Sequence, residues 1–127
     1  GVKLVWHALD DMVGGEIYVK KIPSMSVVDL ARALAPECKL NFVGIRPGEK
    51  LHEQMIGEED AFYTYEYPEH YKILPVINEW SSSPERIKDG VKVAEGFTYR
   101  SDSNTEWMSA DDLMAWVTSN RDYIGRP

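Results

Sequence analysis

The sequence predicts a small mixed α/β lobe, and three observations predict it. Apolar patterns with helical spacing alternate with strand-like apolar runs along the first half of the chain. A length of 127 residues suits one domain with its own core, 1–127, and is too short for two. The sequence contains no glycine-rich loop of the kind that cradles a dinucleotide or a triphosphate. We therefore expect a companion lobe, with helices covering one face of a small sheet.

The first half is expected to form two helices and two strands. Apolar residues at helical spacing predict a helix over 2–12 that Gly14-Gly15 ends, and a short strand follows at 16–19. A capping box, Ser26 to Asp29, opens a second helix that runs through Leu34. The apolar run 40–45 is expected to be a buried strand.

The second half is expected to be richer in strands and loops. Short helical turns are expected around 51–55 and 58–62, strands at 71–75 and 97–99, and an irregular surface loop over 78–96. The alternating row Tyr63-Thr64-Tyr65-Glu66-Tyr67 fits either a base-stacking surface or a strand packed on the core, and core packing is the commoner use. A second capping box, Ser109 to Asp112, opens a helix that runs to about Val117.

Composition excludes several classes of function. The net charge of -7 argues against nucleic acid as a partner, because phosphate backbones require a basic surface. The single cysteine, Cys38, excludes an internal disulfide and a cysteine-cluster metal site, and it fits a reducing compartment. No apolar run approaches the roughly 18 residues of a membrane span, and the first residues have no signal-peptide pattern. These features predict a soluble, cytoplasmic protein without a membrane partner.

Arg46-Pro47-Gly48-Glu49 is the stretch that most directly suggests binding chemistry, because it follows the expected strand 40–45. A guanidinium group is a fixed fork of donors that suits phosphate oxygens, and a nearby Glu can accept hydrogen bonds from sugar hydroxyls. That pairing suits a nucleotide or a nucleotide-sugar. The alternative interpretation is an ordinary turn with a surface ion pair of little energetic value.

Three segments resemble the carboxy-terminal part of inverting UDP-N-acetylglucosamine 4,6-dehydratases, which are extended short-chain dehydrogenase/reductase enzymes. The first is the run 14–25, from Gly14-Gly15-Glu16-Ile17 to Pro23-Ser24-Met25. The second is 43–53, with the Arg46 turn at its centre, and the third is 99–108, with Asn104, Thr105 and Trp107. The similarity covers nearly the whole chain in the same order.

The resemblance implies a division of labour between two domains. An amino-terminal Rossmann domain, absent from these 127 residues, would hold NADP and supply the catalytic groups of this lyase. The present chain would be the carboxy-terminal domain that closes over the UDP-sugar. The whole enzyme would oxidise C4, eliminate water across C5–C6 and return hydride to C6 with inversion at C5. It would serve capsule, O-antigen or flagellin-glycan synthesis, commonly as a homo-hexamer.

The resemblance also implies which residues bind substrate. Arg46 matches the residue that contacts the UDP diphosphate, and Glu49 the acid against the ribose hydroxyls. Asn104 and Glu106 lie in the segment that approaches the sugar. Lys50 adds positive potential near the phosphates, and His52 fits a structural role better than a functional one. No catalytic residue, cofactor-binding residue or metal ligand is expected in this chain, so we expect the isolated chain to be inactive.

Two alternatives remain open at this point. Instead of a dehydratase lobe, the chain would be either a UDP-sugar epimerase lobe from the same superfamily or a self-sufficient binding module that is not an enzyme. The catalytic Lys and Asp of a Rossmann domain would distinguish the epimerase from the dehydratase. An apolar docking face on the chain would distinguish an enzyme lobe from a self-sufficient module.

Overall fold

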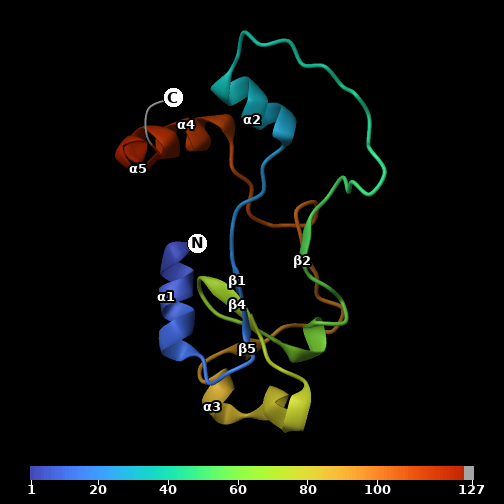
Figure 1. Ribbon diagram of the computed structural model, residues 1–127, viewed down its shortest axis with the longest axis vertical. Helices are drawn as coiled ribbons and strands as arrows, with labels where there is room; N and C mark the ends of the chain where they lie inside the picture. The colour runs from blue at the N-terminus through green and yellow to red at the C-terminus, as the bar shows by residue number, and fades with distance from the viewer. Residues whose placement is uncertain (125–127) are drawn as a thin grey trace. The chain divides into compact units, whose positions relative to one another are not determined.

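Short helices and two antiparallel sheets make up the protein in the computed structural model, which describes residues 1–124 apart from the side chains of residues 78, 79, 123 and 124 (Figure 1). The chain divides into two compact units. The first unit combines Gly1–Ile22 with Gln54–Arg100. The second unit combines Pro23–Glu53 with the described residues from Ser101 onward. Within the described part, every helix is too short or too polar to cross a membrane.

The first unit is built on a four-stranded sheet in the order β1-β4-β3-β5, all antiparallel. The bounds of these strands are Ile17–Lys20 for β1, Thr64–Glu66 for β3, His70–Ile73 for β4 and Val91–Lys92 for β5. The central strand β4 is buried along its whole length, as expected for a strand with a partner on each side. A separate antiparallel pair joins β2, Gln54–Ile56, to β6, Tyr99–Arg100.

Helices of the first unit lie against this sheet or beside it. Helix α1, Val2–Asp11, runs next to β1 (Figure 1). The short elements η1, Ala61–Tyr63, η2, Ile77–Ser82, and α3, Pro84–Ile87, connect the strands. The core has two apolar clusters, one around Ile56, Tyr71 and Tyr99 and one formed by Tyr65, Tyr67 and Leu74.

The second unit pairs two helices, α2, Val27–Leu34, and α4, Ala110–Ser119, and α5, Arg121–Ile124, follows α4. Between α2 and β2 the chain runs from residue 35 to residue 53 without a helix or a strand (Figure 1). A parallel bridge between Ser24 and Trp107 joins the segments that lead into α2 and α4. This unit therefore carries all four residues that the sequence assigns to substrate.

Several predicted elements are confirmed. The helix over 2–12 and the strand at 16–19 are found as α1 and β1, and the helix that the second capping box opens is α4. Core packing of the tyrosine row is confirmed for Tyr65 and Tyr67, which are both buried. Tyr63 belongs instead to η1 and packs against the other apolar cluster, so the three rings do not share one strand face.

Other predictions are wrong. Residues 40–45 form no strand and are exposed, and strand β2 begins at Gln54, within the expected helical turn at 51–55. The expected loop over 78–96 contains most of η2, together with α3 and β5. Strands β2 and β5 have only three and two residues, and each pairs with a strand distant in sequence, β6 and β3, so the local pattern does not reveal them.

Candidate functional site

The Arg46 turn has the backbone that its sequence demands. The N–H of Glu49 donates a hydrogen bond to the carbonyl of Arg46 at 3.0 Å, which closes a β-turn over residues 46–49. Pro47 occupies the second position of this turn, and Gly48 the third, with φ +86°. A positive φ at the third position is the requirement that makes glycine the preferred residue there.

The side chains of Arg46 and Glu49 meet across this turn. One carboxylate oxygen of Glu49 accepts a bond from the Arg46 N–H at 2.7 Å, and the other lies 2.7 Å from Nε and 2.6 Å from Nη2 of the guanidinium. These bonds, first from the backbone and then from the guanidinium, lower the pKa of the Glu49 carboxyl. The ionised carboxylate therefore occupies the edge of the guanidinium fork that a phosphate group would use.

The guanidinium itself faces solvent, because 83% of the Arg46 side chain is exposed. A cavity of about 610 Å³ lies on the carboxylate side of the turn, and Arg46 is not one of the six residues that line it: Ile45, Gly48, Glu49, Lys50, Leu51 and Glu53. Lys50 thus contributes a positive charge to the cavity wall. His52 lies outside this set, with Nε2 3.9 Å from an oxygen of Asp102.

The predicted placement of Arg46 at the end of a buried strand is wrong. Phe42 and Val43, at the middle of that run, are 78% and 84% exposed. A strand requires a neighbour to satisfy its backbone groups, and in this structure no described segment pairs with residues 40–45. The turn and the Glu49 carboxylate, rather than a strand end, therefore hold the guanidinium.

Asn104 and Glu106 form a second pair, in the segment before α4. The Asn104 amide donates to the Ser24 hydroxyl at 3.1 Å, and its side-chain oxygen accepts from the N–H of Glu106 at 3.2 Å. The indole N–H of Trp107 donates to the Asn104 carbonyl at 2.8 Å. Asn104 thereby shapes the turn that presents the exposed Glu106 side chain.

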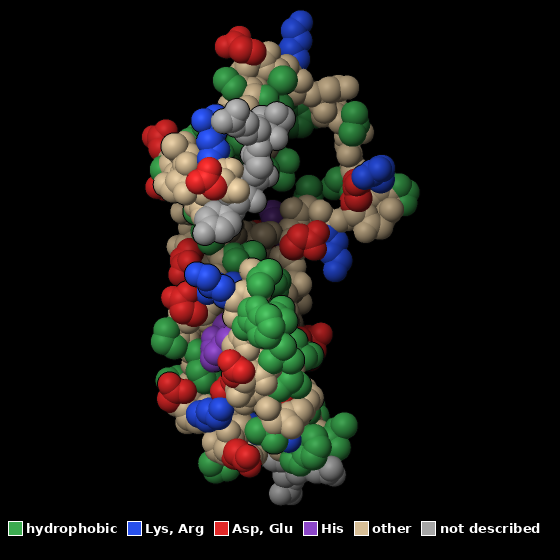
Figure 2. All heavy atoms as spheres, turned by 60° about the vertical axis from the view of Figure 1, so that its left-hand side comes forward, with side chains coloured by type: hydrophobic (Ala, Val, Ile, Leu, Met, Phe, Trp, Pro, Cys, Tyr) green, Lys and Arg blue, Asp and Glu red, His purple; other side chains and the backbone are tan. Residues whose placement is uncertain are grey.

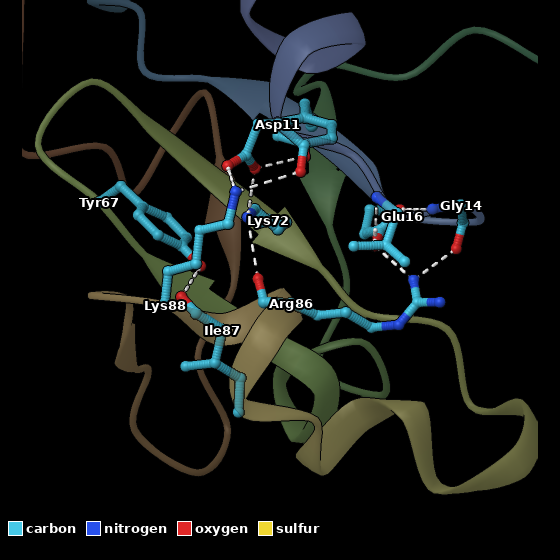
Figure 3. A network of polar contacts seen from close by, with 10 residues as sticks. Asp11, Gly14, Glu16, Tyr67, Lys72, Arg86, Ile87 and Lys88 are labelled. Carbon is cyan, nitrogen blue, oxygen red and sulfur yellow. Dashed lines mark hydrogen bonds and ion pairs between the residues drawn. The ribbon is translucent and has the colours of Figure 1, made fainter.

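A charged network in the first unit has no counterpart among the sequence predictions (Figure 3). Lys72 and Lys88 both pair with the Asp11 carboxylate, to which the Tyr18 hydroxyl also donates at 2.6 Å. Burial opposes ionisation of Asp11, but the bonds from Lys72, Lys88 and Tyr18 outweigh it and hold the pKa of this carboxyl well below its usual range. The sequence does not predict that Lys72 is buried, because a lysine in a strand-like run is ordinarily expected to be solvated.

The same network continues through a second ion pair. The Arg86 guanidinium pairs with Glu16 and donates to the Gly14 carbonyl at 2.6 Å. The Lys72 ammonium donates to the Arg86 carbonyl at 3.0 Å, which connects the two ion pairs. Since each of these buried cations faces a carboxylate, the network fits a structural role that ties α1 and β1 to β4 and α3.

A cavity of about 820 Å³ adjoins this network, beside the first two turns of α1. Its wall includes residues 1–4, His7 and the turn from Tyr67 to His70. The His70 ring stacks on Tyr67 with 4.6 Å between ring centroids. Burial, with the nearby Asp11 carboxylate, raises the pKa of Tyr67 to about 12, and burial lowers the pKa of His70. Both groups are therefore neutral at physiological pH, while Lys3, Lys20, Asp11, Glu69 and Asp89 give the same wall charges of both signs.

Comparisons with known proteins connect this chain to carbohydrate enzymes. The family of polysaccharide biosynthesis proteins matches residues 1–75, which is more than half of the chain. The UDP-N-acetylglucosamine 4,6-dehydratase (inverting) of Campylobacter jejuni subsp. jejuni serotype O:2 is 46% identical over 90% of this chain and 36% of its own length. The enzyme of the same name from serotype O:23/36 is 44% identical over the same shares. The chain thus spans about a third of these relatives.

Two further comparisons are more distant. The UDP-glucose 4-epimerase of Rickettsia bellii is 32% identical over 97% of this chain and 37% of its own length. The crystal structure of Pen from Bacillus thuringiensis superposes with a TM-score of 0.69, at 25% identity, over 94% of this chain and 34% of that protein. The chain belongs to the polysaccharide biosynthesis protein family, and it fits the carboxy-terminal part of inverting UDP-N-acetylglucosamine 4,6-dehydratases.

Proposed function

We propose that this chain is the substrate-binding part of a UDP-N-acetylglucosamine 4,6-dehydratase that forms a 4-keto-6-deoxy sugar with inversion at C5. The observation that carries the proposal is the identity of 44–46% to two such enzymes over 90% of the chain. The UDP-glucose 4-epimerases of Rickettsia canadensis and Rickettsia bellii match at 33% and 32% identity, which supports the dehydratase over the epimerase. The product would serve capsule, O-antigen or flagellin-glycan synthesis in the cytoplasm.

In this proposal the Arg46 turn binds the nucleotide part of the substrate. The guanidinium would donate charge-assisted bonds to the diphosphate, and Glu49 would turn from Arg46 to accept from the ribose hydroxyls. The contact between Arg46 and Glu49 supports this arrangement, since a fork that holds a carboxylate edge-on has the geometry to hold a phosphate. Glu49 would then exchange the Arg46 guanidinium for the ribose hydroxyls and stay in the site.

Asn104 and Glu106 are proposed to act on the sugar. Asn104 bonds to Ser24 and to the backbone of Glu106, so it would act mainly by positioning. Glu106 is exposed and offers two oxygens to sugar hydroxyls. Lys50, in the cavity wall, would add attraction for the anionic substrate.

The chemistry is proposed to belong to a Rossmann domain that binds NADP, in a hexameric enzyme. We assign no residue of this chain to NADP. When bound, NADP would accept a hydride from the sugar and return it. The residues described here would bind and orient the UDP-sugar for that domain, and the chain alone would have no dehydratase activity.

The test uses a chimera in which the amino-terminal part of the serotype O:2 enzyme precedes Gly1. Arg46→Ala in the chimera should weaken UDP binding by about 1.5–3 kcal/mol, the range for a hydrogen bond to a charged group. Arg32→Ala removes the same charge from an exposed position of α2 and is the matched control. Calorimetric titration with UDP measures the dissociation constant of each variant. A dissociation constant for Arg46→Ala within twofold of the control would remove Arg46 from the site.

The chimera also distinguishes the alternative functions. With UDP-N-acetylglucosamine and NADP, a dehydratase yields a 4-keto-6-deoxy product, and an epimerase yields the C4 epimer without loss of water. Mass spectrometry separates the two outcomes, because dehydration removes the mass of one water molecule. A stand-alone binding module would bind UDP equally well with and without the preceding domain.

A further inference from the structure

Helix α1 has apolar side chains on two opposite faces, and only one of these faces is covered. Toward the sheet it turns Leu4, Ala8 and Asp11, which are partly buried. The outer face carries exposed apolar residues at helical spacing, Val2, Val5, Trp6 and Leu9, and the exposed Met12 and Val13 follow directly after the helix; we call these six residues the α1 stripe. Figure 2 turns α1 toward the viewer and shows hydrophobic side chains gathered along it.

An apolar face of a helix is ordinarily covered by a packing partner. The exposure of the α1 stripe is large for side chains of this kind: Val2 is 73% exposed and Trp6 66%. A contiguous apolar row of this length on a soluble protein marks an interaction surface rather than ordinary surface. The row is also free of charged residues, because Lys3 and Asp10 lie at other angles around the helix.

We infer that the α1 stripe is the docking face for the amino-terminal domain that precedes this region in the Campylobacter relatives, an inference that rests on the proposed function. This chain matches 36% of their length, in their carboxy-terminal part, so most of the remainder precedes the matched region. The Gly1 carbonyl accepts the N–H groups of Leu4 and Val5, so α1 begins immediately after Gly1. A preceding domain would thus join the chain at the first turn of the stripe.

The other features of α1 favour the same occupant. The cavity of about 820 Å³ is lined by residues 1–4, so it opens where the preceding domain would arrive. A second copy of the chain fits this face less well, because each copy carries a net charge of -7 and two copies would repel. The partner surface should therefore be an apolar patch of the preceding domain that fits a helix.

Thiol labelling tests this inference without reference to activity. Leu9→Cys, on the stripe, and Val76→Cys, at the start of η2, replace side chains of nearly equal exposure, 59% and 61%. Both are made with Cys38→Ala, and the chimera also has its other cysteines replaced. In the 127-residue chain the two thiols should react with a maleimide at similar rates. In the chimera the thiol at position 9 should react at least about tenfold more slowly, while that at position 76 keeps its rate.

Equal rates at position 9 in the chain and in the chimera would overturn the inference. Protection in the 127-residue chain alone that grows with protein concentration would assign the stripe to a second copy and would also overturn it. If Leu9→Cys prevents folding, Val5→Cys, also 59% exposed, replaces it. UDP titration of the same chimera keeps the two claims separate. Protection of position 9 without UDP binding would retain the docking face and reject the proposed function. UDP binding without protection of position 9 would retain the proposed function and reject the docking face.

Discussion

The Lys72 ammonium lies 2.5 Å from the Asp11 carboxylate, with only 2% of the lysine side chain and 14% of the aspartate side chain exposed. This ion pair joins the central strand β4 to the last turn of α1, which has no fully buried residue of its own. This ion pair therefore adds a buried charge contact to the packing of Leu4 and Ala8 that holds α1 on the sheet. Stability of the first unit should therefore respond to Lys72 and Asp11 more than to any exposed ion pair.

Lys72→Met should lower the free energy of unfolding by about 3 kcal/mol, because it leaves Asp11 partly buried with one cation fewer. Lys88→Met is the matched control: it removes the cation on the other oxygen of Asp11, where the lysine side chain is 45% exposed. The control should cost much less, because solvent screens the charge of an exposed lysine. Urea denaturation of both variants measures the difference, and equal losses would contradict a special role for the buried partner.

The lowered pKa of Asp11 predicts how stability depends on pH. Its folded-state pKa lies below the ordinary value of 3.8, so on acidification the unfolded chain binds this proton before the folded chain does. The stabilisation from Asp11 is therefore present above about pH 4 and is lost as the pH falls below it. Unfolding free energies measured from pH 6 to pH 2 should show this fall.

Asp11→Asn should reduce the steepness of that fall, because the amide does not titrate. Asp10→Asn, the same change at the exposed neighbouring position, should leave the steepness as it is. A residual slope is expected in every variant from other carboxyls with lowered pKa values, such as Glu16 and Asp112. Parallel curves for Asp11→Asn and the unsubstituted chain would show that the pair is formed equally in the unfolded state.

The two helix starts offer a test with a built-in control. Ser109 accepts from the N–H of Asp112 at 3.1 Å and donates to its carboxylate at 2.6 Å, so the predicted capping box of α4 is formed. Ser26 stands at the same position of α2 but makes no capping bond with its side chain. Ser109→Ala should therefore cost about 1 kcal/mol of stability, and Ser26→Ala much less. Thermal melts of both variants decide this, and equal shifts would contradict the assignment of the caps.

That contrast also shows what the sequence could predict and what it could not. Both serines have an acid three residues later, and the pattern correctly predicts where both helices begin. Whether the hydroxyl turns to the backbone depends on the entry of the chain into the helix, which the tetrapeptide does not encode. The helical spacing of α1 is likewise correct, yet spacing alone cannot tell which of its two apolar faces is covered within the chain.

The predicted strand at 40–45 was wrong, and the buried position of Lys72 was not predicted, for a related reason. An apolar run indicates a strand only if a partner strand is available, and the described residues supply none for 40–45. A lysine is expected at the surface unless a buried carboxylate pairs with it. The carboxylate that pairs with Lys72 is Asp11, which lies 61 positions earlier, so the local sequence does not reveal the pair. The Arg46 turn was predictable because Pro47, Gly48 and Glu49 are all local to it. Contacts between neighbours in sequence were thus predicted far better than contacts that the fold creates.

Glu49→Gln separates the two proposed roles of the Arg46 turn. The carboxylate now neutralises the guanidinium, so its removal should strengthen the binding of inorganic pyrophosphate, which has no ribose. The same variant should weaken UDP binding relative to pyrophosphate binding, because an amide oxygen is a poorer acceptor for the ribose hydroxyls than a carboxylate. Glu53→Gln removes one charge from the same cavity wall without touching Arg46, and it should change both affinities alike. Titration of the chimera with the two ligands gives the ratio, and an unchanged ratio for Glu49→Gln would contradict the assignment of Glu49 to the ribose.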